Sequence, residues 1–156
     1  MTLNPADEPV RAEQPATSLP KAPSVEAIRI ALERAWQADT SYDPANWSPQ
    51  NPAWGQCAVT ACVVQDLLGG EIVRSEAILP DGRTIPHYFN RPGAGSDSDL
   101  DFTKIQFPEG TVIPEGQPNP KTFASTREYV LSVEATRRRY LILRERVLAA
   151  LLSLIE

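Results

Sequence analysis

Proline is the residue that most limits how this chain can fold, because its ring fixes φ and removes a backbone N–H that helices and sheets use. The 156-residue sequence contains 15 prolines. Five lie in the first 23 residues, a stretch without apolar periodicity, so we expect residues 1–23 to be a disordered tail. Four more lie between residues 108 and 120, which predicts irregular structure over residues 108–122. The remaining chain, residues 24–156, has a length that suits a single domain.

Two helices are predicted in the first half of the chain. Apolar residues recur at helical spacing over residues 25–38, directly after Ser24, which is a suitable N-cap. A second apolar period covers residues 57–68 and stops at a pair of glycines. Between these helices, residues 39–56 are rich in Pro, Asn and Trp, which indicates an ordered loop packed against the fold.

Three extended segments follow the second helix, at residues 70–79, 84–90 and 99–107. A Pro-Asp-Gly turn separates the first two, and a Gly/Ser-rich turn separates the last two, which predicts an antiparallel meander. One or two helices should then run from about Thr122 to the end, with a broad apolar stripe typical of a core-facing helix. We therefore expect an α+β fold, in which N-terminal helices pack on a small antiparallel meander and a C-terminal helix completes the core.

Charge and composition exclude several classes of function. Fifteen Lys and Arg against 20 Asp and Glu give a net charge of −5, which argues against a nucleic-acid partner. No apolar run approaches the roughly 18 to 20 residues of a membrane span. Two cysteines and one histidine are too few for a disulfide framework or a Cys/His zinc site, and the N-terminal residues show no signal-peptide pattern. We expect a cytoplasmic protein with reduced thiols and no cofactor.

Cys57 is the candidate nucleophile. It falls in the first turn of the predicted helix, where unpaired N–H groups and the positive end of the helix dipole favour a thiolate. The alternative is that Cys57 is a small buried apolar residue, as free cysteines often are. Cys62 fits that alternative better, because it lies mid-helix and about 140° around the helix from Cys57.

His87 is the only histidine of the chain and lies in the predicted strand 84–90. A lone histidine is more often structural than catalytic. If the strands 84–90 and 99–105 pair symmetrically about Ala94, however, His87 lies directly opposite Asp101, at a Cβ separation of about 4.5 to 5.5 Å. Asp101 would then orient the imidazole, and Asp99 takes this role if the register is shifted by two residues.

Together, these residues suit acyl transfer. Cys57 would attack a carbonyl carbon, His87 would remove and return a proton, and Asp101 would hold the imidazole. The backbone N–H of Cys57 and the side-chain amide of Gln56 are candidate donors to the oxyanion, and Trp47 and Trp54 are candidate substrate-binding residues.

Four sequence blocks resemble the YunG family of uncharacterised small bacterial proteins. They are NPAWGQCAVTA (51–61), VVQDLLGGEI (63–72), HYFN (87–90) and LDFTKIQF (100–107). The resemblance covers roughly residues 25–147, and Phe89 and Phe102 depart conservatively from the family pattern. It implies a small bacterial protein and carries no established activity. More distantly, the order Cys, His, Asp on a helix followed by an antiparallel sheet is similar to papain-like and transglutaminase-like cysteine enzymes, which is an analogy of fold only.

Two other functions remain open from the sequence. In the first, the protein is a non-catalytic binding or scaffold protein, and the two tryptophans line a groove for a peptide or small ligand. In the second, His87 binds a metal ion together with Asp97, Asp99 and Asp101, although this run lacks the glycine and the later glutamate of a calcium loop. The substrate would be a peptide, a protein or a small amide, and its pocket would be built from the loops 39–56 and 108–122.

Overall fold

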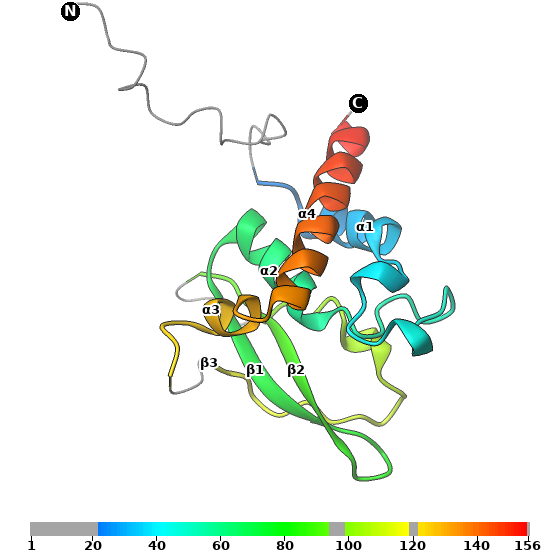
Figure 1. Cartoon of the computed structure of the whole chain (residues 1–156), viewed down its shortest axis with the longest axis vertical. Helices are drawn as coiled ribbons and strands as arrows, with labels where there is room; N and C mark the ends of the chain where they lie inside the picture. The colour runs from blue at the N-terminus through cyan, green and yellow to red at the C-terminus, as the bar shows by residue number, and fades with distance from the viewer. Residues whose placement is uncertain (1–21, 94–98, 119–121, 156) are drawn as a thin grey trace, which may run out of the picture.

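The computed structural model describes residues 22–93, 99–118 and 122–155. Nearly all of the predicted N-terminal tail therefore lies outside the described residues. The described part is an α+β fold with four α-helices and a three-stranded antiparallel sheet (Figure 1). Within this part, no helix is both long enough and apolar enough to cross a membrane.

The first two helices form where the sequence predicts them. α1 (Val25–Ala35) starts at Ser24, whose hydroxyl oxygen accepts the N–H of Ala27, and it ends three residues earlier than predicted. Two short 3-10 turns, η3 (Ala38–Thr40) and η4 (Pro44–Asn46), lie within the loop that follows. α2 (Cys57–Leu68) has the predicted bounds and stops at Gly69, which adopts a positive φ.

The first predicted hairpin is confirmed. β1 (Glu71–Ile78) pairs antiparallel with β2 (Thr84–Arg91), in a register that places Ser75 opposite His87. Asn90 points toward the helical side of this hairpin, because its side-chain Nδ2 donates to the carbonyl of Ala61 in α2 at 2.9 Å.

The third predicted strand, over residues 99–107, is wrong. Only Leu100 bridges β2, opposite Asn90, and the chain then turns into η5 (Lys104–Gln106). The alternation of polar and apolar residues in this segment does not place the apolar ones inside: Ile105 is 65% exposed, whereas Gln106 is 6% exposed. Gln106 turns inward, and its side chain accepts the N–H of Gly55 outside the sheet.

The third strand comes instead from the proline-rich segment that was expected to be irregular. β3 (Gln117–Pro118) pairs with the free edge of β1, so the strand order is β2-β1-β3. A proline is tolerated here because β3 is an edge strand, in which alternate backbone N–H positions face away from the neighbouring strand.

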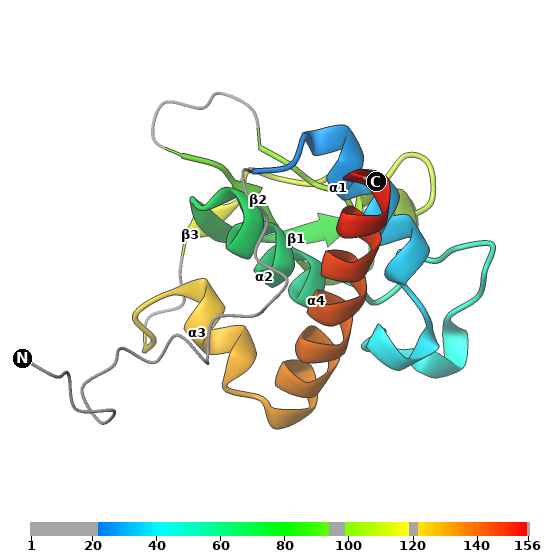
Figure 2. The same cartoon turned by 90° about the horizontal axis from the view of Figure 1, so that it is seen from above.

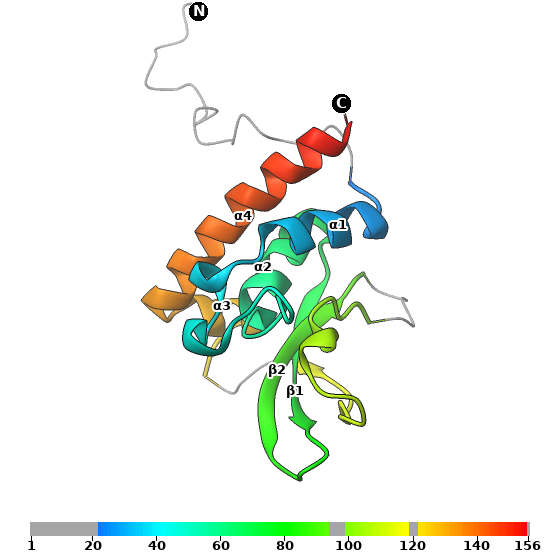
Figure 3. The same ribbon diagram turned by 90° about the vertical axis from the view of Figure 1, so that its right-hand side faces the viewer.

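Two helices complete the chain. α3 (Thr126–Leu131) is capped by the hydroxyl of Ser125, and α4 (Glu134–Ile155) is the longest element. α2 lies between the sheet and α4, and α1 packs against α4 (Figures 2 and 3). Buried apolar side chains of these three helices and of β1 form the core; among the largest are Ile28, Leu32, Trp36, Val63, Leu143, Val147 and Leu151.

Candidate active site

Cys57 is the first residue of α2 and is a free, partly exposed thiol. The preceding turn depends on Gly55, whose φ is +72° and where a Cβ would lie 2.3 Å from the hydroxyl oxygen of Ser41. Gln56 is the N-cap, but its side chain makes no hydrogen bond to the first turn. The backbone N–H groups in the first turn of α2 therefore lack a side-chain cap, and they can donate to another acceptor that lies beside the thiol.

Cys62 has the opposite environment. It is fully buried in the core, and this burial raises the pKa of its thiol to about 12. A thiol of this kind stays protonated at neutral pH and is a poor nucleophile. The two cysteines of the chain therefore offer an internal comparison between an accessible and an inert thiol.

His87 lies on β2 with its side chain completely buried. Its ring stacks on Phe89 at a centroid distance of 5.5 Å and meets the edge of Phe107 at 4.9 Å. Its Nε2 lies 2.7 Å from Oδ2 of Asp101, a hydrogen bond in which the imidazole N–H donates to the carboxylate. The aromatic rings and the carboxylate together fix the position of the imidazole.

The pKa of His87 is raised to about 9. Burial acts in the other direction and lowers the pKa, since it disfavours the charged ring. The hydrogen bond to Asp101 and the influence of the nearby thiol of Cys57 more than offset this effect. The thiol of Cys57 is therefore close enough to the imidazole to favour its charged form. Because Asp101 holds Nε2, Nδ1 is the ring nitrogen that is left without a partner among the described residues, and no hydrogen bond joins the thiol to the ring.

Asp101 reaches His87, but not through the predicted strand pairing. The observed bridge between Asn90 and Leu100 belongs to a different register from the one that would place Asp101 directly opposite His87. The side chain reaches the imidazole from the turn that follows the bridge. Asp99, the predicted substitute, instead forms an ion pair with Arg91 at 3.1 Å.

Buried polar atoms without a hydrogen-bond partner concentrate around this site. The described residues contain five such side-chain atoms, and four of them belong to Gln56, His87, Asp101 and Gln106. The fifth is Nε of Arg139 on α4. Buried polar groups in folded proteins are nearly always paired, so a group of exceptions at one place is typical of a functional site.

Gln56 is fully buried, and its Nε2 donates to the carbonyl of Gln37 at 3.0 Å. Gln106, which the sequence did not single out, accepts the N–H of Gly55 on its Oε1 at 3.2 Å. Its main-chain carbonyl accepts from Nδ2 of Asn51 at 3.0 Å. Gln106 therefore connects the segment that carries Asp101 to the turn that precedes Cys57. No local sequence signal marks this role, because the contact spans about fifty residues of chain.

Trp47 and Trp54, the predicted substrate-binding residues, are both half-buried in the loop before α2. The indole N–H of Trp47 donates to the carbonyl of Pro52 at 2.9 Å, and that of Trp54 donates to Asp43 at 3.1 Å. Both indole N–H groups are thus used to hold the loop itself. Their role toward a ligand stays a prediction.

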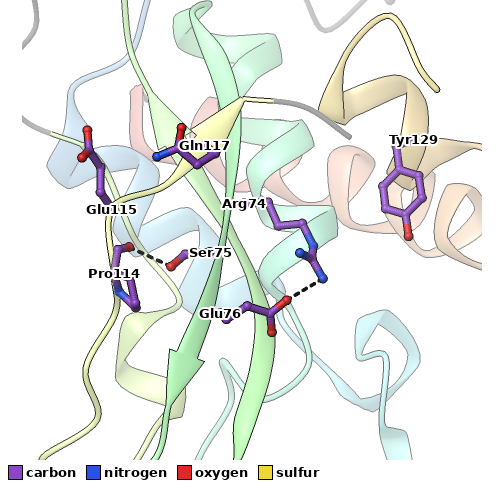
Figure 4. Close-up of a pocket in the computed structure, with 7 residues that line it drawn as sticks. All are labelled: Arg74, Ser75, Glu76, Pro114, Glu115, Gln117 and Tyr129. Carbon is purple, nitrogen blue, oxygen red and sulfur yellow. Dashed lines mark hydrogen bonds and ion pairs between the residues drawn. The ribbon is translucent and has the colours of Figure 1, made fainter. Parts of the chain in front are cut away.

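A pocket of about 450 Å³ opens beside the edge of β1 (Figure 4). It is lined by β1, by the segment that leads into β3 and by α3; the residues are Arg74, Ser75, Glu76, Pro114, Glu115, Gln117 and Tyr129. Arg74 and Glu76 form an ion pair at 2.8 Å within it. The predicted pocket loop 108–122 contributes three of these residues, whereas the loop 39–56 contributes none.

Tyr88 lies directly opposite the pocket residue Arg74 in the register of β1 and β2. Burial raises the pKa of its phenol, while a hydrogen bond from Arg74 acts to lower it. Cys57, His87 and Asp101 do not line the pocket, so it is separate from the proposed reacting groups.

A metal site is not found in the described part of the chain, where no three His, Cys, Asp or Glu side chains are grouped so as to hold an ion. Asp97, one of the four predicted ligands, lies outside the described residues. Asp99 is engaged by Arg91, and Asp101 by His87.

Comparison with known proteins supports the resemblance noted in the sequence. Over 51 residues, the chain is 35% identical to a Bacillus subtilis (strain 168) protein described as "Uncharacterized protein YunG". That alignment covers 33% of this chain and 42% of the relative, so it spans less than half of each. No solved structure matches the chain. The YunG protein family itself matches residues 24–152, which include Cys57, His87 and Asp101. The chain therefore belongs to the YunG protein family.

Proposed function

We propose that this protein is a cysteine-dependent hydrolase or acyl transferase that acts on an amide or peptide bond. Cys57 is the nucleophile, His87 the general base and acid, and Asp101 the group that orients the imidazole. The observation that carries the proposal is the state of His87. Its imidazole is completely buried, is bonded to Asp101, and has a pKa raised to about 9 in part by the thiol of Cys57.

The raised pKa supports a particular resting state. An imidazole with a pKa of about 9 carries a positive charge at neutral pH and stabilises a thiolate beside it. The unpaired N–H groups at the start of α2 favour the same negative charge.

The substrate is a peptide, a protein or a small amide. The pocket beside β1 is the proposed place for a part of the substrate remote from the reacting bond, because neither Cys57 nor His87 lines it. By analogy of element order alone, a cysteine at a helix start followed by an antiparallel sheet that carries histidine is similar to papain-like and transglutaminase-like enzymes. Both cysteines are free thiols, which fits a cytoplasmic setting.

Alkylation with iodoacetamide tests the proposal. At pH 7, peptide mapping by mass spectrometry should find Cys57 modified well before Cys62, whose burial keeps it protonated. His87→Ala should slow the labelling of Cys57, and His87→Gln provides a second variant of closer size. The proposal fails if Cys57 reacts with the pH midpoint of an ordinary thiol, about 8.5, or at the same rate with and without His87.

The competing function is ligand binding without catalysis, and the pocket beside β1 favours it independently of the thiol. Under this alternative, Cys57→Ala leaves both ligand binding and the cellular effect of the protein unchanged. Under the enzyme proposal, the same variant still binds its ligand but loses turnover.

A further inference from the structure

Gln106 presents a hydrogen-bond donor that the fold does not use. The residue is 6% exposed, and its Nε2 is buried without a partner among the described residues. Its Oε1 accepts the N–H of Gly55 at 3.2 Å. Because a backbone N–H bonds to an oxygen, this contact also assigns which end of the amide is the nitrogen.

The location of this amide is next to the proposed reacting groups. Gly55 is the second residue before Cys57, so the amide contacts the turn that leads into the nucleophile. Phe107, the residue after Gln106, packs its ring against the imidazole of His87 at 4.9 Å. Gln106 therefore lies between the turn that leads into Cys57, which its Oε1 contacts, and Phe107, whose ring contacts His87.

Leaving a buried amide N–H unpaired is unfavourable, and such groups persist where a ligand supplies the missing acceptor. We propose that Nε2 of Gln106 donates a hydrogen bond to the carbonyl oxygen of the substrate as that oxygen becomes an oxyanion. The inference rests on the proposed function and identifies a further catalytic residue for it. The backbone N–H of Cys57 is the second donor.

The reaction then proceeds in two stages. The thiolate of Cys57 forms a C–S bond to the carbonyl carbon, and the π electrons of the carbonyl move to its oxygen, where Gln106 stabilises the charge. When the C=O bond re-forms, the C–N bond breaks and the amine leaves with a proton from the imidazolium of His87. Water, deprotonated by His87, attacks the thioester through a second oxyanion; the C–S bond breaks, the acid is released and the thiolate returns.

Gln56 was the amide expected to fill this role. Its Nε2 is already bonded to the carbonyl of Gln37, and the unpaired atom of its side chain is Oε1, an acceptor. An acceptor repels an oxyanion, whereas a donor stabilises it. Between the two glutamines, Gln106 is therefore the one whose unpaired atom suits the chemistry.

Two reactions of Cys57 separate an oxyanion donor from a structural residue. Iodoacetamide is attacked at a saturated carbon and forms no oxyanion, whereas p-nitrophenyl acetate acylates the thiol through one. The ratio of the acylation rate to the alkylation rate therefore measures oxyanion stabilisation, and a general disturbance of the thiol cancels from it.

Gln106→Glu keeps an acceptor for the N–H of Gly55 and replaces the donor, and Gln106→Met removes both. We expect each variant to lower the ratio on the order of 10²-fold. A carboxylate at position 106 also disfavours a thiolate nearby, so Gln106→Glu is judged by the ratio and not by either rate alone. Gln50→Met is the matched control, because Gln50 is an exposed glutamine in the loop before α2. This variant should leave the ratio unchanged.

The inference is overturned if Gln106→Glu slows both reactions by the same factor, which indicates a structural role, or slows neither. Should Gln106→Met not fold, Gln106→Glu decides the question, because it retains the contact to Gly55. Failure of the proposed function has a different signature: wild-type Cys57 then reacts with both reagents no faster than an ordinary thiol.

Discussion

Asp101→Asn removes the charge that holds His87 while keeping the size of the side chain. Asp101 and Cys57 both raise the pKa of His87, and burial lowers it. Without the carboxylate, the thiol of Cys57 is the main group that opposes the effect of burial on the pKa of His87. We expect the pKa of His87 to fall from about 9 by roughly 1 to 3.

The same substitution should change how stability depends on pH. The pKa of His87 is about 9 in the folded protein against 6.5 for the free side chain, and this difference corresponds to about 3 kcal/mol. Because the folded pKa is the higher one, the stabilisation is fully present below pH 6.5 and is lost as the pH rises through 9. Asp101→Asn should remove much of it, so the variant loses more stability at pH 6 than at pH 10.

Nuclear magnetic resonance measures the pKa without ambiguity, because His87 is the only histidine in the chain. Urea denaturation at pH 6 and pH 10 measures the stability. Asp99→Asn is the matched control, since this carboxylate pairs with Arg91 rather than with His87. A wild-type His87 that titrates near 6.5, or a pKa that is equal in wild type and Asp101→Asn, refutes the reasoning.

Three other substitutions test the fold around the site. Asn90→Ala removes the side-chain hydrogen bond from β2 to the carbonyl of Ala61 in α2 and should cost about 0.5 to 1.5 kcal/mol in urea denaturation; an unchanged midpoint would contradict this. Gly55→Ala forces a Cβ into the loop before α2 and should slow alkylation of the cysteine that follows, whereas Gly82→Ala, where a Cβ meets nothing within 4 Å, should not. Leu143→Ala opens a cavity in the helical core and should lower the free energy of unfolding by about 2 to 5 kcal/mol. Leu141→Ala, at an exposed position of the same helix, should change it by less than about 0.5 kcal/mol. Similar losses for both variants would refute the assigned packing.

The elements that the sequence predicted well are those with a strong local signal. α2 has its predicted bounds because its apolar period is regular and a pair of glycines ends it. The β1–β2 hairpin follows from two extended runs around a Pro-Asp-Gly turn. The position of Cys57 at a helix start, and hence its candidacy, depended only on these local patterns.

The errors arose where long-range contacts outweigh local patterns. Residues 99–107 alternate like a strand, yet Gln106 turns inward to bond the N–H of Gly55 while Ile105 remains in solvent. The proximity of Asp101 to His87 was predicted from a strand register that the fold does not contain, so the correct contact followed from an incorrect premise. β3 was missed because its pairing with β1 depends on an edge left open in the sheet, which the proline-rich segment does not reveal by itself.

The most direct test of the coupling between thiol and imidazole is the pKa of His87 in Cys57→Ala, measured by nuclear magnetic resonance beside wild type and Cys62→Ala. If the thiol helps to charge the ring, Cys57→Ala lowers the pKa of His87 below its value of about 9, and Cys62→Ala leaves it in place. An identical pKa in all three proteins would mean that Cys57 and His87 do not interact, and the proposed chemistry would have no basis.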